Sequence, residues 1–238
     1  MPEGYQHGPI NCRLCFNQES DVLILNDWRL RNNPGYYGSN NPEILVLGFS
    51  KGATQNKATE TGDFDKVAFA GARRRLQKVF ETLKIMPNDR GIDDLLTARE
   101  RTFGIASLVR CSFCKIKGNK CITSGEVIPT AFSNPLTKEI IQRCAAAFLS
   151  NLPDRLRLVV LLGTSDIYIE RTRSIISNLY TNFASVNECA FYTGRILWIY
   201  AAHPSPGNGH FLSWTTSGEQ SKQGKKRIQA LQAIEALV

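Results

Sequence analysis

Long hydrophobic segments are missing from this sequence. None of its 238 residues lies in an apolar run of about 18 residues or more, the length that a membrane-spanning helix needs. The opening stretch, MPEGYQHGPINC, also lacks the basic start and apolar run of a secretory signal. We therefore expect neither a membrane partner nor export, and we expect a cytoplasmic, nucleoid-associated location.

Repeats, low-complexity tracts and interdomain linkers are missing as well. With 42% hydrophobic and 21% charged residues, the chain has the composition of one globular domain, which we expect to span residues 1–238 as a monomer. Neither a G-x-G-x-x-G fingerprint nor a phosphate-loop lysine motif occurs. A nucleotide-binding α/β enzyme is therefore disfavoured.

Basic residues outnumber acidic ones. The 29 Lys and Arg residues against 21 Asp and Glu residues give a net charge of +8 and a pI near 9.2. This balance favours a polyanionic partner such as nucleic acid, with ordinary surface charge as the simpler alternative.

Seven cysteines occur, at positions 12, 15, 111, 114, 121, 144 and 189. An odd number without a secretory signal argues against a disulfide framework. Metal binding, catalysis and simple burial remain as explanations.

Buried strands and amphipathic helices alternate along the chain. Continuous apolar runs predict strands that are buried on both faces, at 44–48, 103–109, 158–163 and 196–202. Helix-length amphipathic stretches lie at 70–84, 137–152, 167–183 and 223–237. This alternation predicts a three-layer α/β/α sandwich with a central four-stranded, mainly parallel sheet. The segment 112–136, rich in Gly, Lys, Ser and Pro, reads as a long functional loop.

The residues that follow each strand are the candidates for function, because ligands of such sheets bind at the carboxyl ends of the strands. The last predicted strand ends in AAHPSPGNGH, which places His203 beside two prolines and a glycine-rich turn.

Four stretches in this order and spacing resemble the uracil-DNA glycosylase superfamily: EILVLGFSKGATQ, IASLVRC, LVVLLG and AAHPSPGN. The resemblance is closest to the branches that carry an iron–sulfur cluster, and it runs from about residue 12 to the C-terminus. It implies a DNA repair enzyme that hydrolyses the N-glycosidic bond of uracil and leaves an abasic site. Uracil-containing or damaged DNA is then the expected partner.

The same resemblance assigns four cysteines to a [4Fe-4S] cluster. They are Cys12 and Cys15 of CRLC, Cys111 of LVRC and Cys144, and soft thiolates suit such a cluster. Spacing alone favours a zinc site instead, made by Cys12, Cys15, Cys111 and Cys114, with Cys121 able to replace one member. For Cys189 we expect unliganded burial.

Breaking an N-glycosidic bond passes through an oxocarbenium-like sugar and a departing base anion. The resemblance implies that His203 stabilises the base anion, with a ring N–H directed at the carbonyl oxygen of the base. The alternative is a core histidine that is hydrogen-bonded to backbone.

The group that positions water differs from most relatives. Many carry an acidic residue or Asn where this chain has Phe49, and one branch uses an aspartate further along, after a Thr-Gly and a Phe. This chain reads Thr61-Gly-Asp-Phe-Asp65 there. We therefore nominate Asp65, with Asp63 as second choice, against the alternative of solvated loop carboxylates.

The base pocket is expected at Gly48 and Phe49, with Phe64 as the aromatic that stacks on the flipped base and Phe69 as its alternative. Ser107 stands where base-selective relatives hold an asparagine. A hydroxyl discriminates less than an amide, so we expect other deaminated or damaged bases to be accepted too.

DNA contacts are expected from glycine-rich turns, basic side chains and one apolar wedge. The candidates are Lys51, Gly52, Ser205, Gly207, Asn208 and Phe211, with Leu212 as a second choice for the wedge and basic runs at 73–75 and 225–227. Two other functions remain: a non-catalytic reader of damaged DNA, and a lyase in which Lys51 attacks the sugar.

Overall fold

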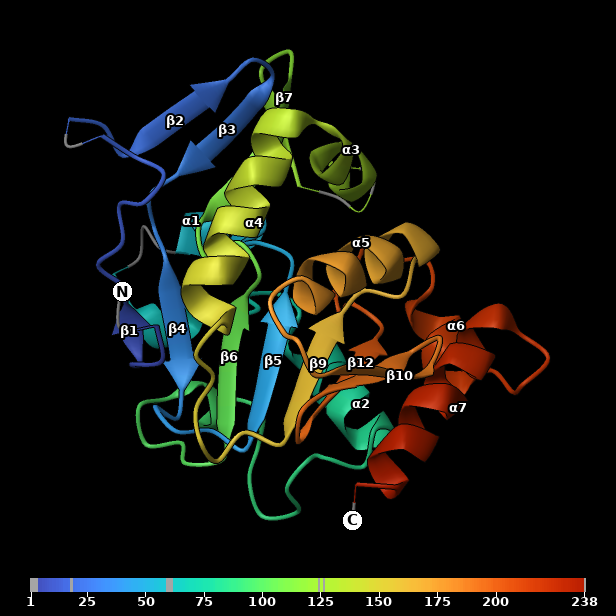
Figure 1. Ribbon diagram of the computed structural model, residues 1–238. Coiled ribbons are helices and arrows are strands. Elements are labelled where there is room, and N and C mark those ends of the chain that lie inside the picture. Colours follow the sequence, from blue (N-terminus) through green and yellow to red (C-terminus); the bar gives the residue numbers. More distant parts are fainter. Residues whose placement is uncertain (1–3, 18, 59–61, 124, 126, 238) are drawn as a thin grey trace.

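The structure is a computed structural model that describes residues 4–17, 19–58, 62–123, 125 and 127–237. Within these residues, eight strands form one mixed sheet (Figure 1). In spatial order they are β1 (Gly8–Pro9), β4 (Gly35–Gly38), β6 (Phe103–Ser107), β5 (Ile44–Gly48), β9 (Leu158–Leu162), β12 (Ile196–Ala201), β11 (Ala190–Thr193) and β10 (Phe183–Asn187).

The four strands expected from sequence are neighbours in this sheet, and β6, β5, β9 and β12 pair in parallel. The prediction of a central four-stranded, mainly parallel sheet is nevertheless wrong. Antiparallel strands β4 and β1 continue the sheet beyond β6, and β11 and β10 continue it beyond β12. Strands β1 and β4 are short and β10 is largely exposed, and none of the three contains a long apolar run, so periodicity does not reveal them.

A second, antiparallel sheet holds β2 (Val22–Leu25), β3 (Trp28–Arg31), β7 (Ser112–Lys117) and β8 (Lys120–Ile122). The expectation of a long loop over 112–136 is therefore also wrong, because β7, β8 and helix α3 (Val127–Ser133) occupy most of it. Trp28 and Phe113 stack on each other at 4.9 Å and bury the inner face of this sheet.

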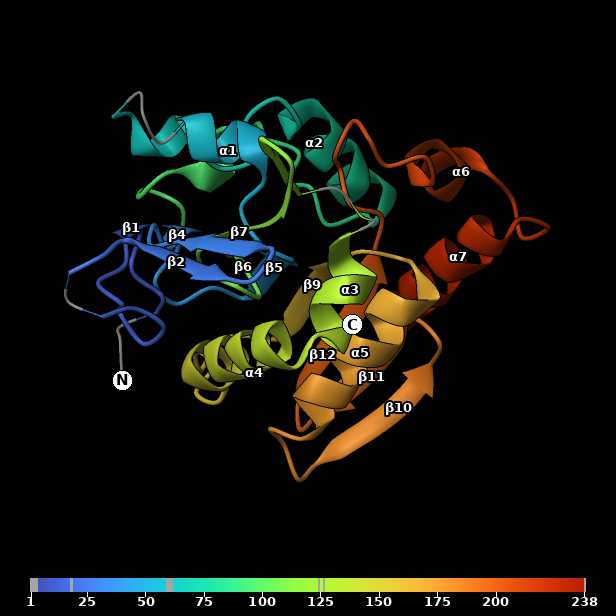
Figure 2. The same ribbon diagram turned by 90° about the horizontal axis from the view of Figure 1, so that it is seen from above.

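Helices cover both faces of the large sheet (Figure 2). One face carries α3, α4 (Pro135–Leu149) and α5 (Asp166–Ser177), and the other carries α2 (Arg73–Thr82), α6 (Phe211–Thr216) and α7 (Lys222–Glu235). Shorter elements are α1 (Ala53–Ala58), η2 (Phe64–Lys66) and η3 (Asp94–Leu96). In the described chain, no helix is long and apolar enough to cross a membrane.

Alternate residues of each central strand enter two separate cores. On β5, Leu45 and Leu47 pack toward α4 and α5, whereas Val46 packs toward α2. The four central strands end at one edge of the sheet, and the segments after them bring the candidate residues to that edge.

Candidate functional site

His203 lies two residues beyond the end of β12 and is partly buried. Its Nδ1 accepts the backbone N–H of Ser205 at 3.1 Å, so the ring proton resides on Nε2. Burial, together with the positive charge of Arg75, lowers the pKa of His203 to about 4. The ring is therefore neutral at physiological pH, and Nε2–H is its one donor.

The turn after His203 is held by its own hydrogen bonds. Asn208 Nδ2 donates to the carbonyl oxygen of His203 at 2.8 Å, and Asn208 Oδ1 accepts from the backbone N–H of His210 at 3.0 Å. Ser205 Oγ accepts from the N–H of Gly207 at 3.3 Å. The sequence predicts DNA contacts for Ser205, Gly207 and Asn208. In the structure, their polar groups hold the turn that positions His203.

Phe69 and Arg75 are the neighbours of His203. The Phe69 ring lies 6.4 Å from the imidazole, is buried, and has a φ of +50°, a left-handed conformation that a bulky residue adopts only under constraint. Arg75 donates to the carbonyl oxygen of Asn208 at 3.5 Å and stacks on Phe211 at 3.8 Å.

The preferred aromatic, Phe64, lies elsewhere. It stacks on Tyr37 at 4.3 Å and contacts the ring of His7. Phe69, the alternative, is the aromatic that the structure brings to His203.

Gly48 and Ser107 are register partners on β5 and β6. A methyl group added at Gly48 would lie 3.7 Å from Ser107 Oγ, and within the described residues this hydroxyl makes no hydrogen bond. Phe49 does not join them, because its ring packs into the core against Phe113 and Phe132 at 6.2 and 5.5 Å.

Both nominated carboxylates already have partners. Asp65 Oδ1 lies 2.9 Å from His7 Nε2, and Asp63 forms an ion pair with Lys66 at 2.9 Å. In the part of the chain that the structure describes, no carboxylate hydrogen-bonds to His203. The assignment of Asp65 or Asp63 beside the histidine is not what the geometry shows, and Thr61 of the same motif lies outside the described residues.

Three of the DNA-contact candidates face inward. Lys51 is 5% exposed and donates to the carbonyl oxygen of Asn33, and the N–H of Gly52 is taken by the side chain of Gln55. Phe211 is 9% exposed beneath Arg75, whereas Leu212 beside it is 68% exposed.

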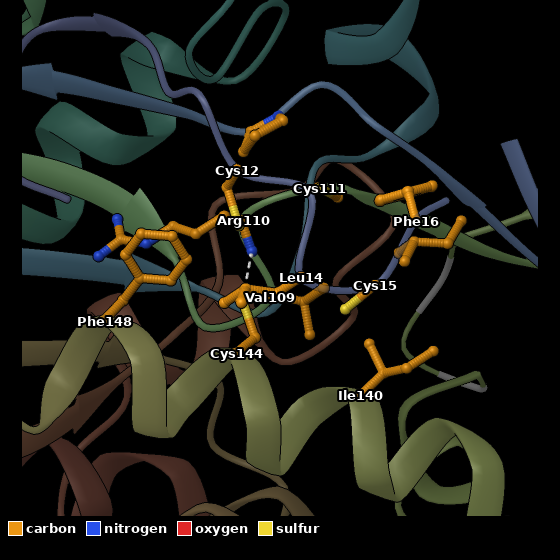
Figure 3. A pocket seen from close by; sticks show the side chains of 12 residues that line it. Cys12, Leu14, Cys15, Phe16, Val109, Arg110, Cys111, Ile140, Cys144 and Phe148 are labelled. Atoms are coloured by element: carbon orange, nitrogen blue, oxygen red, sulfur yellow. Dashed lines mark hydrogen bonds between the residues drawn. The ribbon is translucent and has the colours of Figure 1, made fainter. Parts of the chain in front are cut away.

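The four cysteines of the resemblance line one small pocket with a cavity volume of about 20 Å³, which we call the cysteine pocket. Figure 3 shows Cys12 and Cys15 on the N-terminal segment and Cys144 on α4 facing across it, with Cys111 between β6 and β7. Its other walls are mostly apolar, made by Leu14, Phe16, Leu30, Pro34, Val109, Arg110, Ile140 and Phe148.

The thiols in this pocket are poor acids on their own. Burial raises the pKa of both Cys111 and Cys144 to about 12, and it raises the pKa of Cys15 as well. A metal would therefore have to displace their protons to be bound. The backbone N–H of Arg110 donates to Cys144 Sγ at 3.3 Å, as iron–sulfur sites use N–H groups on ligand sulfurs. Across the described ranges, no three His, Cys, Asp or Glu side chains are arranged to hold a single metal ion.

The four cysteines that spacing assigned to zinc, Cys12, Cys15, Cys111 and Cys114, do not lie together. Cys114 is disulfide-bonded to Cys121 across β7 and β8, so neither lines the cysteine pocket. This disulfide also departs from the expectation of no such bonds. The hairpin pairs Cys121 with Ile116, two residues from Cys114 on the same strand, which brings the two cysteines close together. Cys189 is free and buried.

Arg75 and Arg110 were undervalued by sequence reasoning. The sequence analysis named Arg75 only as part of the basic run 73–75. Its spacing of four residues to the buried Val79 indicates that it lies next to the core. For Arg110 the signal was its place at the end of a buried strand. For His7, which hydrogen-bonds to Asp65, the sequence contains no signal that we can identify.

A scan against protein-family models and a search of curated proteins find no match to this chain. Function is therefore argued from residues and geometry.

Proposed function

We propose that this protein is a monofunctional DNA glycosylase that hydrolyses the N-glycosidic bond of uracil, and of other deaminated bases, to leave an abasic site. The observation that carries the proposal is His203, a neutral imidazole at the carboxyl edge of the sheet. Its Nδ1 accepts from Ser205 N–H, and its Nε2–H has no acceptor among the described residues. A donor fixed in this way suits a base that leaves as an anion.

The flipped base would lie between the strand ends and α2. There, Phe69 offers an aromatic face, and Ser107 offers one rotatable hydroxyl to the edge of the base. His203 Nε2–H would donate to a carbonyl oxygen as negative charge develops on it, which stabilises the transition state by roughly 3–4 kcal/mol.

Contacts to the DNA itself would come from the same edge. Leu212 is an exposed apolar side chain directly after the histidine turn, placed to fill the gap that a flipped base leaves. The net charge of +8 supplies a general attraction to phosphates.

The cofactor that we propose is a [4Fe-4S] cluster held by Cys12, Cys15, Cys111 and Cys144. The residues fit it, because four free thiols line one largely apolar pocket. The cluster would supply a structural link among the N-terminal segment, the end of β6 and α4. Zinc bound by the same four thiols is the alternative.

The test is a labelled duplex with one uracil, incubated with protein and then divided, with one half treated with alkali. Strand breaks after alkali alone are expected, and His203→Ala should lower the rate about 100-fold or more. His210→Ala is the matched control, because His210 is exposed seven residues away in the same turn. Breaks without alkali would instead indicate the lyase. Burial lowers the pKa of Lys51 to about 8, which favours the free amine, but the side chain is only 5% exposed and donates to the carbonyl oxygen of Asn33. Full activity of His203→Ala would refute the proposal.

One observation favours the second function, a non-catalytic reader of damaged DNA. Asp65 and Asp63 are both bound to other side chains, and Phe49 belongs to the core. Among the residues that the structure describes, none of the nominated groups is therefore free to orient water at the site. A reader would retain uracil-containing duplex in a binding assay and release no base.

A further inference from the structure

Arg110 is a buried cation without a counter-charge. The residue is 1% exposed, and none of its three guanidinium nitrogens has a hydrogen-bond partner. The guanidinium is instead surrounded by the rings of Phe148, Tyr5 and Tyr36, at 4.8, 5.7 and 5.9 Å. Aromatic faces offset only part of the cost of burying a charge, so this position calls for an anion nearby.

Lys51 is a second buried cation in the same region. It is 5% exposed, and its backbone forms a β-bridge with Ser112, next to Cys111. Its Nζ donates to a neutral acceptor, the carbonyl oxygen of Asn33. Throughout the described residues, neither Lys51 nor Arg110 forms an ion pair with a carboxylate. Protein groups therefore leave both positive charges unbalanced.

The cysteine pocket borders Arg110 directly and lies close to Lys51. Arg110 and Phe148 form part of its wall, and Pro34, which also lines it, directly follows the carbonyl that Lys51 binds. Figure 3 shows the Arg110 side chain extending toward Phe148, while its backbone N–H points at Cys144. Arg110 thus acts on the pocket through its charge and not through a side-chain hydrogen bond.

We infer that Arg110, assisted by Lys51, is the counter-charge of an anionic metal–thiolate centre in the cysteine pocket, and that it sets how firmly this centre is held. Four thiolates around a [4Fe-4S] core, or around one zinc ion, carry roughly two net negative charges. Two buried cations balance them. This inference rests on the proposed cofactor and not on base excision.

The experiment compares holoprotein purified under anaerobic conditions with three variants. Arg110→Met removes the charge and keeps the volume, and Arg110→Lys keeps the charge. Arg143→Met is the matched control, because Arg143 lies near Cys15 but is exposed to solvent, which screens its charge. The measurements are metal per chain, the rate of metal loss to a chelator, and the midpoint potential of the one-electron reduction by a titrant.

Metal loss should be at least tenfold faster in Arg110→Met than in the wild type, and less than twofold faster in Arg110→Lys and Arg143→Met. The midpoint potential should fall by about 59 mV, a tenfold change for one electron, because a nearby positive charge stabilises the reduced form. If Arg110→Met does not accumulate as folded protein, Lys51→Met is measured in the same way, with a smaller shift of the same sign.

Wild-type protein with neither iron nor zinc would overturn the inference, and so would an Arg110→Met variant that holds its metal and potential unchanged. If the metal is zinc, the rate of zinc loss decides by the same criterion. None of these measurements uses DNA, so failure here is distinct from failure to excise uracil.

Discussion

His203 keeps one charge state across the physiological pH range. Its Nδ1 can accept from Ser205 only while unprotonated, and Arg75 adds to the cost of a second proton on the ring. A neutral donor does not lose its proton to the departing base anion as readily as an imidazolium would, so it stabilises the anion without titrating at neutral pH.

The pKa of His203 predicts a dependence of stability on pH. The unfolded chain binds a proton at this ring below about pH 6.5, whereas the folded protein does so only below about pH 4. Between these values the unfolded state binds more protons than the folded state, so the contribution of His203 to the free energy of unfolding is fully present above about pH 6.5 and is lost as the pH falls to about 4.

This pH change lowers the free energy of unfolding by at most about 3 kcal/mol, and solvent that reaches the partly exposed ring limits the effect. Urea unfolding at pH 7, 6, 5 and 4 measures it, and His203→Asn should remove this part of the pH dependence. An identical pH profile in that variant would show that the ring titrates normally.

We expect substitution of Phe69, but not of Phe64, to weaken substrate binding. Replacing Phe69 by Leu removes the aromatic face beside His203, and stacking of one base on such a ring contributes about 1–3 kcal/mol. Phe64→Leu is the control, since Phe64 stacks on Tyr37. Binding of a uracil-containing duplex to an inactive background is the readout, and equal losses in both variants would contradict the assignment.

Ser107 predicts the range of bases. Its hydroxyl is unbonded and rotates freely, whereas an amide at the same position presents a fixed donor and a fixed acceptor. Ser107→Asn should therefore raise the ratio of uracil excision to excision of a second deaminated base, measured in parallel single-turnover assays. An unchanged ratio would place base selection elsewhere.

Among the secondary-structure elements, those with strong periodic patterns are predictable and the others are not. The strands β5, β9 and β12 follow from uninterrupted apolar runs, and α2, α4, α5 and α7 begin and end within about five residues of their predicted bounds at most ends. The C-terminal end of α5 is the exception, because the predicted helix ran on into β10.

The remaining strands were missed for a physical reason. β4 consists of Gly-Tyr-Tyr-Gly, and β10 has a largely exposed middle, so pairing with a neighbour and not local pattern decides their conformation. The second sheet was not predicted for the same reason, because β7 has no continuous apolar run and its lysines alternate with apolar residues. At the site, the strand-end rule pointed to His203 and Ser107, whereas the cysteines came from the family resemblance. The partners of Asp65 and Lys51 depend on chain segments far away in the sequence.

Helix α4 carries Cys144, and its first turn is capped by Asn134, whose side chain accepts from the N–H groups of Leu136 and Thr137. Asn134→Ala should lower the free energy of unfolding by about 1 kcal/mol. Ser150→Ala at the other end of the helix is the control, since that residue makes no side-chain cap bond. Urea denaturation of the metal-loaded protein distinguishes the two.

For the molecule as a whole, the cysteine pocket joins three distant parts of the chain. Cys144→Ala should abolish an absorption band near roughly 400 nm that bleaches on reduction, and should lower the iron content in proportion. Cys189→Ala is the matched control, because this buried cysteine lies outside the pocket. Loss of the band in both variants would indicate a general effect on folding.

The separation of these thiols along the chain also fixes an order of events during synthesis. Cys12 and Cys15 leave the ribosome early, and the roughly 130 residues up to Cys144 take on the order of 10 s to follow. Over that interval, the first two thiols have no complete ligand set to join. Delivery of the proposed metal centre would therefore meet a chain that is already more than half made, with the early thiols open to oxidation until then.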